Sequence, residues 1–413
     1  MLRGLSGKQL APLRLVGFRL LFLSILGSSV GTFFAAIALT IDVKDRTNSG
    51  VWVGAVLVVE FLPAIFVGLA LGPLLDRLQR RSLMVGADLV RVAVFCVLPF
   101  ATSAAETVAL ALVAGLATGF FRPAVYAGVP NLVPEDQLGP ANALIQTVEN
   151  LSWAAGPVLG GLLTAAAGPH AAYWINAASF LLSALFVARI PARLLQSATA
   201  LTRGHWTDIK DGVRTVVRSN ALLAVLIGWG IASLGGGSVS VSEVFMAKNT
   251  LHAGDFGYGL LYGGIGTGLV LGSVWSSTAI ERLGSARAYG TSLALMAIGF
   301  GAAAASPDIW VAAACCVVGG AGNGTAVVCN ALLVQRGAPD QMRGRALTFV
   351  MSATFTLTGI STVLAGAFIG SAGARWVWGG GAAAFAVAAV VGYALARDAV
   401  GSDVAAVEVT ANP

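Results

Sequence analysis

The sequence predicts an all-α membrane protein with twelve transmembrane helices in two pseudo-symmetric six-helix bundles. Three observations predict this fold class. Only 11% of the 413 residues are charged and 57% are apolar, whereas about a quarter of the residues of a soluble protein are charged. Apolar stretches recur along the whole chain, and the two halves share repeated segments. Since the mean hydropathy is +0.82, most of the surface is expected to face lipid.

The predicted spans are the apolar stretches of about 20 or more residues, the length that crosses the hydrocarbon core of a bilayer as a helix. Short polar connections separate most of them, as expected for helices packed as neighbours. The spans cover residues 17–41, 51–75, 82–102, 107–133, 141–167, 171–191, 221–246, 257–280, 287–306, 309–334, 346–371 and 375–396.

The longest connection, residues 192–220, is basic and contains a short amphipathic segment. It divides the chain into an N-terminal bundle over residues 1–191 and a C-terminal bundle over residues 221–397. We predict that the connection is a cytoplasmic linker lying along the membrane surface. The small, mildly acidic residues 398–413 predict a disordered cytoplasmic tail.

The two halves also repeat each other. GLALGP, beginning at Gly68, returns as GLVLGS, beginning at Gly268, and parallel repeats of this kind are typical of secondary transporters. Most of the 25 Lys and Arg residues fall on one side of the predicted membrane, so the positive-inside rule places both termini in the cytoplasm. The net charge of +6 therefore belongs to loops beside a membrane and does not indicate nucleic-acid binding. We expect a multi-pass protein of a bacterial cytoplasmic (inner) membrane.

Five ionisable side chains lie within the predicted spans, all in the N-terminal half: Glu60, Asp88, Arg91, Arg122 and Glu149. An unpaired charge at the membrane centre costs about 2.5–3.5 kcal/mol on insertion scales, so these groups should face the bundle interior or a wet cavity. Asp88 and Arg91, three residues apart, are most simply an internal ion pair. Arg122 and Glu149 lie at a similar depth, and the four groups can form one network of balanced charge.

Glu60 has no cation at its depth, and a desolvated carboxyl without a cation can carry a proton. We therefore regard Glu60 and Glu149 as candidates for proton handling, with a satisfied structural carboxyl as the alternative for each. Glu243, near the outer end of its span, is expected to be interfacial. Asn323 and Asn330 are buried polar groups that either meet a substrate or form hydrogen bonds between helices.

The fifth predicted span contains the run GPVLGG, which brings Gly156, Pro157, Gly160 and Gly161 close together. Pro157 removes one helical hydrogen bond and is expected to kink the helix. The glycines form a smooth face on which another helix can approach closely. This face is a packing seam, and it can also serve as a gate, since the two roles are compatible.

Some chemistries lack their sequence patterns. No P-loop pattern for an ATP-driven pump and no zinc-protease pattern occurs. The four cysteines fall inside apolar runs without metal-ligand spacing. We therefore expect no enzyme activity, no cofactor and no metal site.

At residues 72–81 the hairpin GPLLDRLQRR resembles the loop between helices two and three of the major facilitator superfamily. Gly72, Asp76, Arg77 and Arg81 match the glycine, acidic and basic positions of that loop, and Arg80 adds a further positive charge. The resemblance implies the major facilitator fold, with this loop acting in gating as a cytoplasmic latch between the two halves. Asp88 and Arg91 follow in the next span and belong to the same gating and packing group.

The segments EFLPAIFVG, GFFRPAVYAGVPNLVPEDQL and GPVLGG are similar to the branch of drug:proton antiporters that contains enterobactin exporters and macrolide efflux proteins. Related exporters often carry an acid after the position of Gly31, where this chain has Thr32. Val148 and Ser152 stand where the helix-five motif of such antiporters has glycines. These departures remove a helix-one carboxylate from the expected coupling mechanism and leave Glu60 and Glu149 as its candidates.

The resemblance implies a secondary active efflux transporter that exports a small, fairly apolar compound, such as a drug, an antibiotic or a siderophore-like molecule, by proton antiport with alternating access. An importer or facilitator of the same fold is the first alternative, and a non-transporting membrane receptor is the second. The implied partners are the compound, protons and the lipid bilayer, and the implied state is a monomer. Arg122 would set the electrostatics of the cavity. The cavity residues are expected to be Thr32, Phe33, Phe121, Arg122, Trp229, Asn323 and Asn330.

Overall fold

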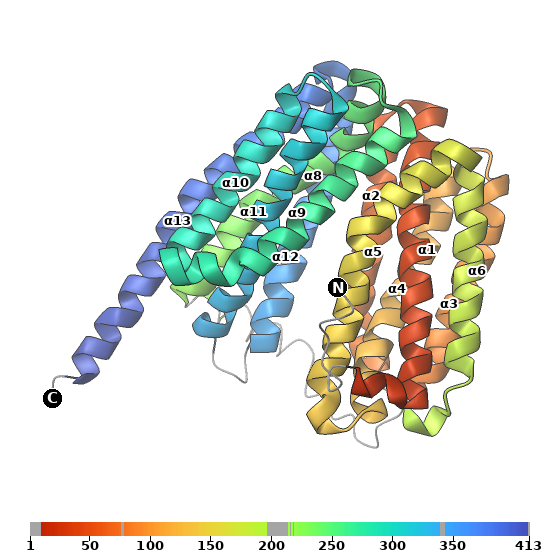
Figure 1. The fold of residues 1–413 in the computed structure, drawn as a ribbon, viewed down its shortest axis with the longest axis horizontal. Coiled ribbons are helices and arrows are strands. Elements are labelled where there is room, and N and C mark those ends of the chain that lie inside the picture. The colour runs from red at the N-terminus through yellow and green to blue at the C-terminus, as the bar shows by residue number, and fades with distance from the viewer. Residues whose placement is uncertain are drawn as a thin grey trace. The chain divides into compact units, whose positions relative to one another are not determined.

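The computed structural model describes residues 10–75, 78–195, 214, 216–217, 219–338 and 343–411, and within these ranges all regular structure is helical (Figure 1). The chain forms two compact units, Met1–Asn48 with Ala55–Thr202 and Ser49–Gly54 with Arg203–Pro413. Each unit is considered by itself.

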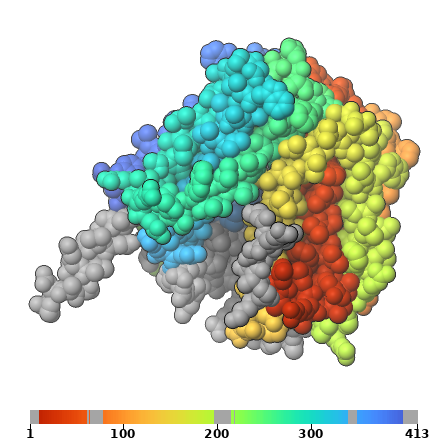
Figure 2. All heavy atoms as spheres, viewed as in Figure 1, coloured from red at the N-terminus to blue at the C-terminus, as the bar shows by residue number. Residues whose placement is uncertain are grey.

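The first unit contains long helices joined by short connections. Their bounds are α1 (Val16–Thr47), α2 (Gly50–Leu75), α3 (Arg80–Val97), α4 (Ala104–Leu132), α5 (Leu138–Ala167) and α6 (Pro169–Ala188). Helix α1 packs between α5 and α6, as Figures 1 and 2 show, and α3 packs against α6 and α4. Buried apolar side chains such as Phe18, Met84 and Val187 join these helices into one core.

Local signals explain where several of these helices begin. The Ser103 hydroxyl accepts from the Glu106 backbone N–H at 3.2 Å, and the Glu106 carboxylate accepts from the Ser103 N–H at 3.3 Å, which makes a capping box at the start of α4. Gly168 adopts φ +77° between α5 and α6, a conformation that favours glycine. Pro169 then opens α6, where its missing N–H costs nothing.

The second unit has a similar build. Its helices are α8 (Asn220–Phe245), α9 (Gly254–Leu283), α10 (Ser285–Ala305), α11 (Ile309–Gly337), α12 (Arg343–Ala372) and α13 (Ala374–Ala411). Helix α8 continues into a π-helix over Met246–Thr250. Helix α8 packs extensively against α13 and α12, and α11 packs against α9 and α10.

Glycines set the spacing between α9 and α11. A Cβ atom added at Gly268, Gly272 or Gly324 would collide with the backbone carbonyl oxygen of Val317, Ala321 or Leu269, respectively. The two helices therefore lie closer than any side chain larger than hydrogen permits. This is the small-residue packing expected of helices in a membrane.

Nine helices in the described part of the chain combine the length and apolar character needed to cross a membrane. The protein is thus a multi-pass membrane protein, and the predicted helical spans correspond to observed helices with shifted ends. Helix α1 is the clearest case, because it continues to Thr47, beyond its predicted end at residue 41.

Two predicted segments need separate comment. The sequence predicts a disordered tail at 398–413, but α13 continues as a helix to Ala411. This segment is rich in alanine, the residue with the highest helix propensity, and has no proline before Pro413. The predicted linker at 192–220 lies mostly outside the described residues, and it begins with a 3₁₀ turn at Ala192–Leu194.

Candidate functional site

A cavity of about 310 Å³ opens in the first unit between α1, α3, α4 and α5. Aromatic rings from three helices form its apolar wall, and hydroxyl, amide and charged groups complete it. Thr32, Phe33, Phe121 and Arg122, four of the predicted cavity residues, belong to its lining. The full lining is Ile25, Ser28, Ser29, Thr32, Phe33, Arg91, Thr118, Phe121, Arg122, Val125, Tyr126, Gln146, Glu149, Asn150 and Trp153.

Arg122 and Glu149 form an ion pair across this cavity. Arg122 Nη2 lies 3.1 Å from Glu149 Oε1, and the Tyr126 hydroxyl donates to Glu149 Oε2 at 3.1 Å. Arg122 and Tyr126 are one helical turn apart on α4, so both reach the same carboxylate on α5. The Arg122 side chain is 57% exposed and the Glu149 side chain 21%, which leaves the pair accessible to water and to a ligand.

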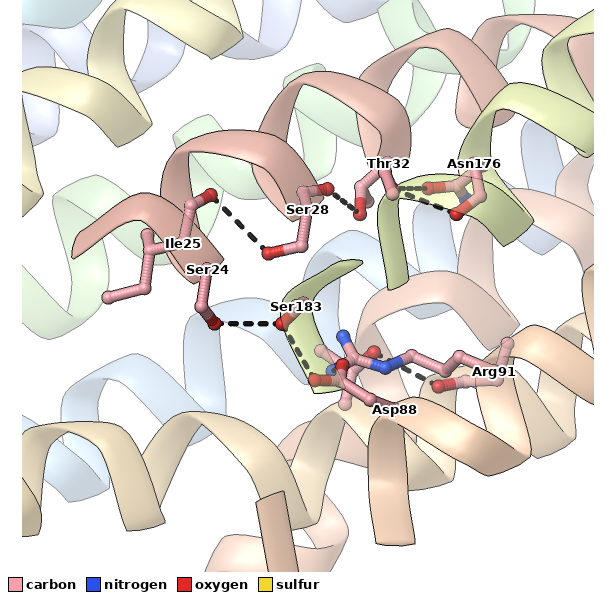
Figure 3. Close-up of polar contacts among 11 residues, drawn as sticks. Ser24, Ile25, Ser28, Thr32, Asp88, Arg91, Asn176 and Ser183 are labelled. Atoms are coloured by element: carbon pink, nitrogen blue, oxygen red, sulfur yellow. Dashed lines mark hydrogen bonds and ion pairs between the residues drawn. The ribbon is translucent and has the colours of Figure 1, made fainter. Parts of the chain in front are cut away.

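A second ion pair, Asp88 with Arg91, is buried behind the cavity wall (Figure 3). The Ser183 hydroxyl of α6 donates to Asp88 Oδ2 at 2.6 Å, and Ser24 of α1 lies 2.7 Å from the same hydroxyl. This hydrogen-bond chain joins α1, α6 and α3. The ion pair predicted from the i, i+3 spacing is therefore present.

The four charged groups do not join into the single network that the sequence suggested. The guanidinium of Arg91 lies between two rings, with its Cζ 4.5 Å from the Phe121 centroid and 4.2 Å from the Phe180 centroid. These stacked rings favour a cation through its attraction to their faces. In the described residues the result is two separate pairs, one buried and one open to the cavity.

A third polar cluster lies at the end of α1, where the sequence predicted none. Asp42 Oδ2 accepts from the Tyr173 hydroxyl at 3.0 Å, and Asp42 Oδ1 accepts from Arg46 Nε at 2.8 Å. Arg46 also donates to the Ala101 carbonyl oxygen at 2.6 Å. The prediction missed this cluster because it ended the helix before Asp42, although the i, i+4 spacing of the acid and the arginine was a usable signal.

The glycine face of α5 packs against α1. A Cβ atom at Gly156 would lie 2.5 Å from the Phe33 Cβ, and one at Gly160 would lie 3.1 Å from the Phe34 Cα. Pro157 lies inside α5 and is buried with Gly161. This seam fixes Phe33 at the cavity wall, while its predicted role in gating stays a prediction.

The basic hairpin is only partly described. Asp76 and Arg77 lie outside the described residues, and Gly72 belongs to α2. Arg80 Nη1 donates to the carbonyl oxygens of Ala127 and Leu195, both at 2.9 Å. Arg81 Nη2 donates to the Ala188 carbonyl oxygen at the end of α6, at 2.6 Å. These hydrogen bonds hold the ends of helices within the first unit, and the predicted latch between the halves stays a prediction.

Two carboxyls are set apart from these clusters. Glu60, on α2, is half-buried and makes no hydrogen bond or ion pair with the described residues, in keeping with its predicted lack of a cation. Glu243 is 2% exposed, so its predicted interfacial position is wrong. The prediction placed it near the end of a helix, but α8 is surrounded by other helices of its unit up to that end.

The remaining predicted cavity residues belong to the second unit. Trp229 lies on α8, and Asn323 and Asn330 lie on α11, all three half-buried. The Asn330 Oδ1 atom is buried without a hydrogen-bond partner. Sequence reasoning missed Tyr126 and Trp153, although each lies four residues from a charged group that it did identify. No group of three or more potential metal ligands occurs among the described residues.

Structural comparison defines the class of the protein. The chain superposes on a bacterial homologue of the iron transporter ferroportin in an inward-facing state, with a TM-score of 0.74, 15% identity, and 92% and 98% of the two chains covered. It also superposes on the nucleoside transporter NupG, with a TM-score of 0.70, 14% identity, and 92% and 98% coverage. At this identity the likeness shows the fold, which is that of a multi-pass transporter.

Sequence comparison gives the family. Residues 7–412 match the family of transmembrane secretion effectors of the major facilitator superfamily, and the chain belongs to this family. It is therefore a membrane transporter and not an enzyme.

Individual relatives are more distant. The chain is 26% identical to macrolide efflux protein A of Streptococcus pyogenes over 49% of this chain and 52% of that protein. It is 24% identical to the multidrug efflux pump Tap of Mycolicibacterium fortuitum over 86% and 89% of the two chains. The match thus spans about half the length of the macrolide efflux proteins and most of the length of Tap.

Proposed function

We propose that this protein is a secondary active exporter of a small, fairly apolar compound, driven by proton antiport. In this proposal the long helices form twelve spans in two six-helix bundles, and the protein acts as a monomer in a bacterial cytoplasmic membrane with both termini in the cytoplasm. The observation that carries it is the ion pair of Arg122 and Glu149 in an aromatic-lined cavity. The names of the relatives, macrolide efflux and multidrug efflux, support the direction of transport.

The chemistry of the pair accounts for antiport. Ionised Glu149 accepts from Arg122 and Tyr126, and each carboxylate oxygen keeps lone pairs for a further donor. A compound with an amine or another strong donor binds best to this ionised form. A proton on Glu149 removes the negative charge and weakens that binding. Because compound and proton favour opposite states of one carboxyl, binding one releases the other.

The rest of the cavity suits an apolar body with scattered acceptors. Phe33, Phe121 and Trp153 offer apolar area. Arg122 uses one N–H toward Glu149 and makes no other hydrogen bond with the described residues. Its remaining donors are available to carbonyl or ether oxygens of the compound.

Reconstituted vesicles with an imposed pH gradient test the proposal, with ethidium and erythromycin as probes. We expect gradient-driven movement of at least one probe in the wild type. Glu149→Gln should lower this movement by about tenfold, equivalent to about 1.4 kcal/mol, while movement down the probe's own gradient continues. Glu60→Gln tests the second predicted proton carrier in the same assay.

Glu106→Gln is the matched control, because it removes an exposed carboxylate outside the cavity while glutamine keeps the capping box. Unchanged gradient-driven movement in both Glu149→Gln and Glu60→Gln would contradict the assignment of the coupling residues. An importer would be indicated if cells lacking the protein accumulated less of the probe than cells containing it.

A further inference from the structure

Glu243 is a buried carboxyl to which the proposed mechanism gives no role. It lies on α8, and its side chain is sealed from solvent at 2% exposure. Its Oε2 atom has no hydrogen-bond partner, and the carboxyl makes no ion pair with the described residues. The packing of α8 against its neighbouring helices leaves it no route to bulk water in this arrangement.

The other buried or half-buried carboxyls of the described helices differ in this respect, with Glu60 as the exception. Asp88 is paired with Arg91 and accepts from Ser183. Asp42 is paired with Arg46 and accepts from Tyr173. Glu243 therefore lacks the partners that make an ionised carboxylate tolerable in the interior of a membrane protein.

The charged and titratable groups around this end of α8 are engaged elsewhere or uncharged. Lys248, further along the chain, pairs with Asp255 at the start of α9. Arg375 at the start of α13 donates to the Ala304 carbonyl oxygen at 2.8 Å. The Cys316 thiol of α11 lies within electrostatic range of Glu243, and a buried thiol is a weak neutral donor.

These contacts fix the charge of Glu243. An ionised carboxylate at this position would be desolvated without compensation, so the group holds a proton and is neutral in this arrangement. Releasing that proton requires a change that admits water or brings a donor to the carboxyl.

The backbone next to Glu243 departs from the regular α-helix. Residues Met246–Thr250 form a π-helix, and the Met246 N–H is shared between the carbonyl oxygens of Ser242 and Glu243. A π-turn has weaker hydrogen-bond geometry than an α-turn and is frequent at functional sites. The segment that carries Glu243 thus ends at a place where the helix can change its winding at low cost.

We propose that Glu243 is a second proton-carrying residue, located in the second unit, which is protonated in the arrangement described here and ionised in another state of the transport cycle. The step is a proton transfer only: the carboxylic acid releases H⁺ to water that enters beside the π-helix, and the carboxylate later recovers one. This inference rests on the proposed proton coupling.

Infrared spectroscopy of the purified protein tests the protonation state. The spectrum of the wild type minus that of Glu243→Gln at pH 7 should contain the carbonyl band of a protonated carboxylic acid, and the band should shift in heavy water. Glutamine has the shape of the neutral acid, so this variant should fold as the wild type does. Glu281→Gln, at an exposed position on α9, should give no such band. Absence of the band at Glu243 would overturn the inference.

Transport in reconstituted vesicles tests the role. The pH gradient that just balances a fixed gradient of the probe, ethidium or erythromycin, gives the number of protons exchanged per probe molecule. Glu243→Gln should lower this number while keeping probe binding. An unchanged number would make Glu243 a neutral structural group and overturn the inference alone. If the wild type shows no proton-coupled movement, the proposed function fails, and this inference fails with it.

Discussion

The two units solve the problem of packing helices in different ways. In the first unit, paired charges and hydroxyl groups join α1, α3, α4, α5 and α6, and a cavity opens beside them. In the second unit, glycines on α9 and α11 bring backbones into direct contact. The comparison indicates that one unit carries most of the exchangeable chemistry and the other gives a tightly packed frame. Glu243 is the feature of the second unit that departs from this division.

The largest expected effect concerns the buried pair of the first unit. Asp88→Ala leaves the Arg91 guanidinium buried without its anion, and breaking one side of a buried ion pair costs about 3–5 kcal/mol. Thermal or denaturant unfolding in detergent measures the loss. The double variant Asp88→Leu with Arg91→Leu should recover much of it, because apolar residues of similar size need no partner. An equal loss in single and double variants would contradict this account of the pair.

A smaller effect is expected at the glycine seam of the second unit. Gly272→Val places a side chain against the Ala321 carbonyl oxygen, and overpacking of this kind costs about 1–3 kcal/mol. Gly379→Ala, on α13 with open space around the added carbon, is the control and should be neutral or slightly stabilising. Similar unfolding midpoints for the two variants would show that α9 and α11 can separate without loss, against the proposed frame.

The hydroxyl of Tyr126 tests the open cluster of the first unit. Tyr126→Phe removes one hydrogen bond to Glu149, and one such bond is worth about 0.5–1.5 kcal/mol. Because the cluster is accessible, we expect little change in unfolding and a change of about two- to tenfold in the affinity for ethidium. Equilibrium fluorescence measures that affinity, and a large loss of stability with unchanged affinity would make the cluster structural.

The smallest effects should be the same in kind in both units. Ser103 caps α4 and Ser219 caps α8, with acceptor distances of 3.2 and 3.4 Å. Replacing either serine by alanine should cost about 0.5–2 kcal/mol, with the smaller loss at the longer bond. Unfolding of the two variants checks this baseline. If either loss approached that of Asp88→Ala, helix ends rather than the buried pair would dominate stability.

Much of the fold was predictable from local patterns. The apolar runs predicted the helices, and the i, i+3 spacing predicted the pairing of Asp88 with Arg91. Both are properties of a single segment, because transfer to lipid and contacts within one helix depend only on nearby residues. The chain also supplied Thr32, Phe33, Phe121 and Arg122 as cavity residues.

Only the tertiary structure decided which side chains from different helices meet. Glu149 pairs with Arg122 and not with Arg91, Asp42 meets Tyr173, and Glu243 meets no cation. These outcomes depend on how each helix is rotated about its axis and how far it extends. Sequence periodicity does not fix that rotation in a helix that is apolar on nearly every face, because every orientation buries a similar area. The packing of neighbouring helices supplies the missing information.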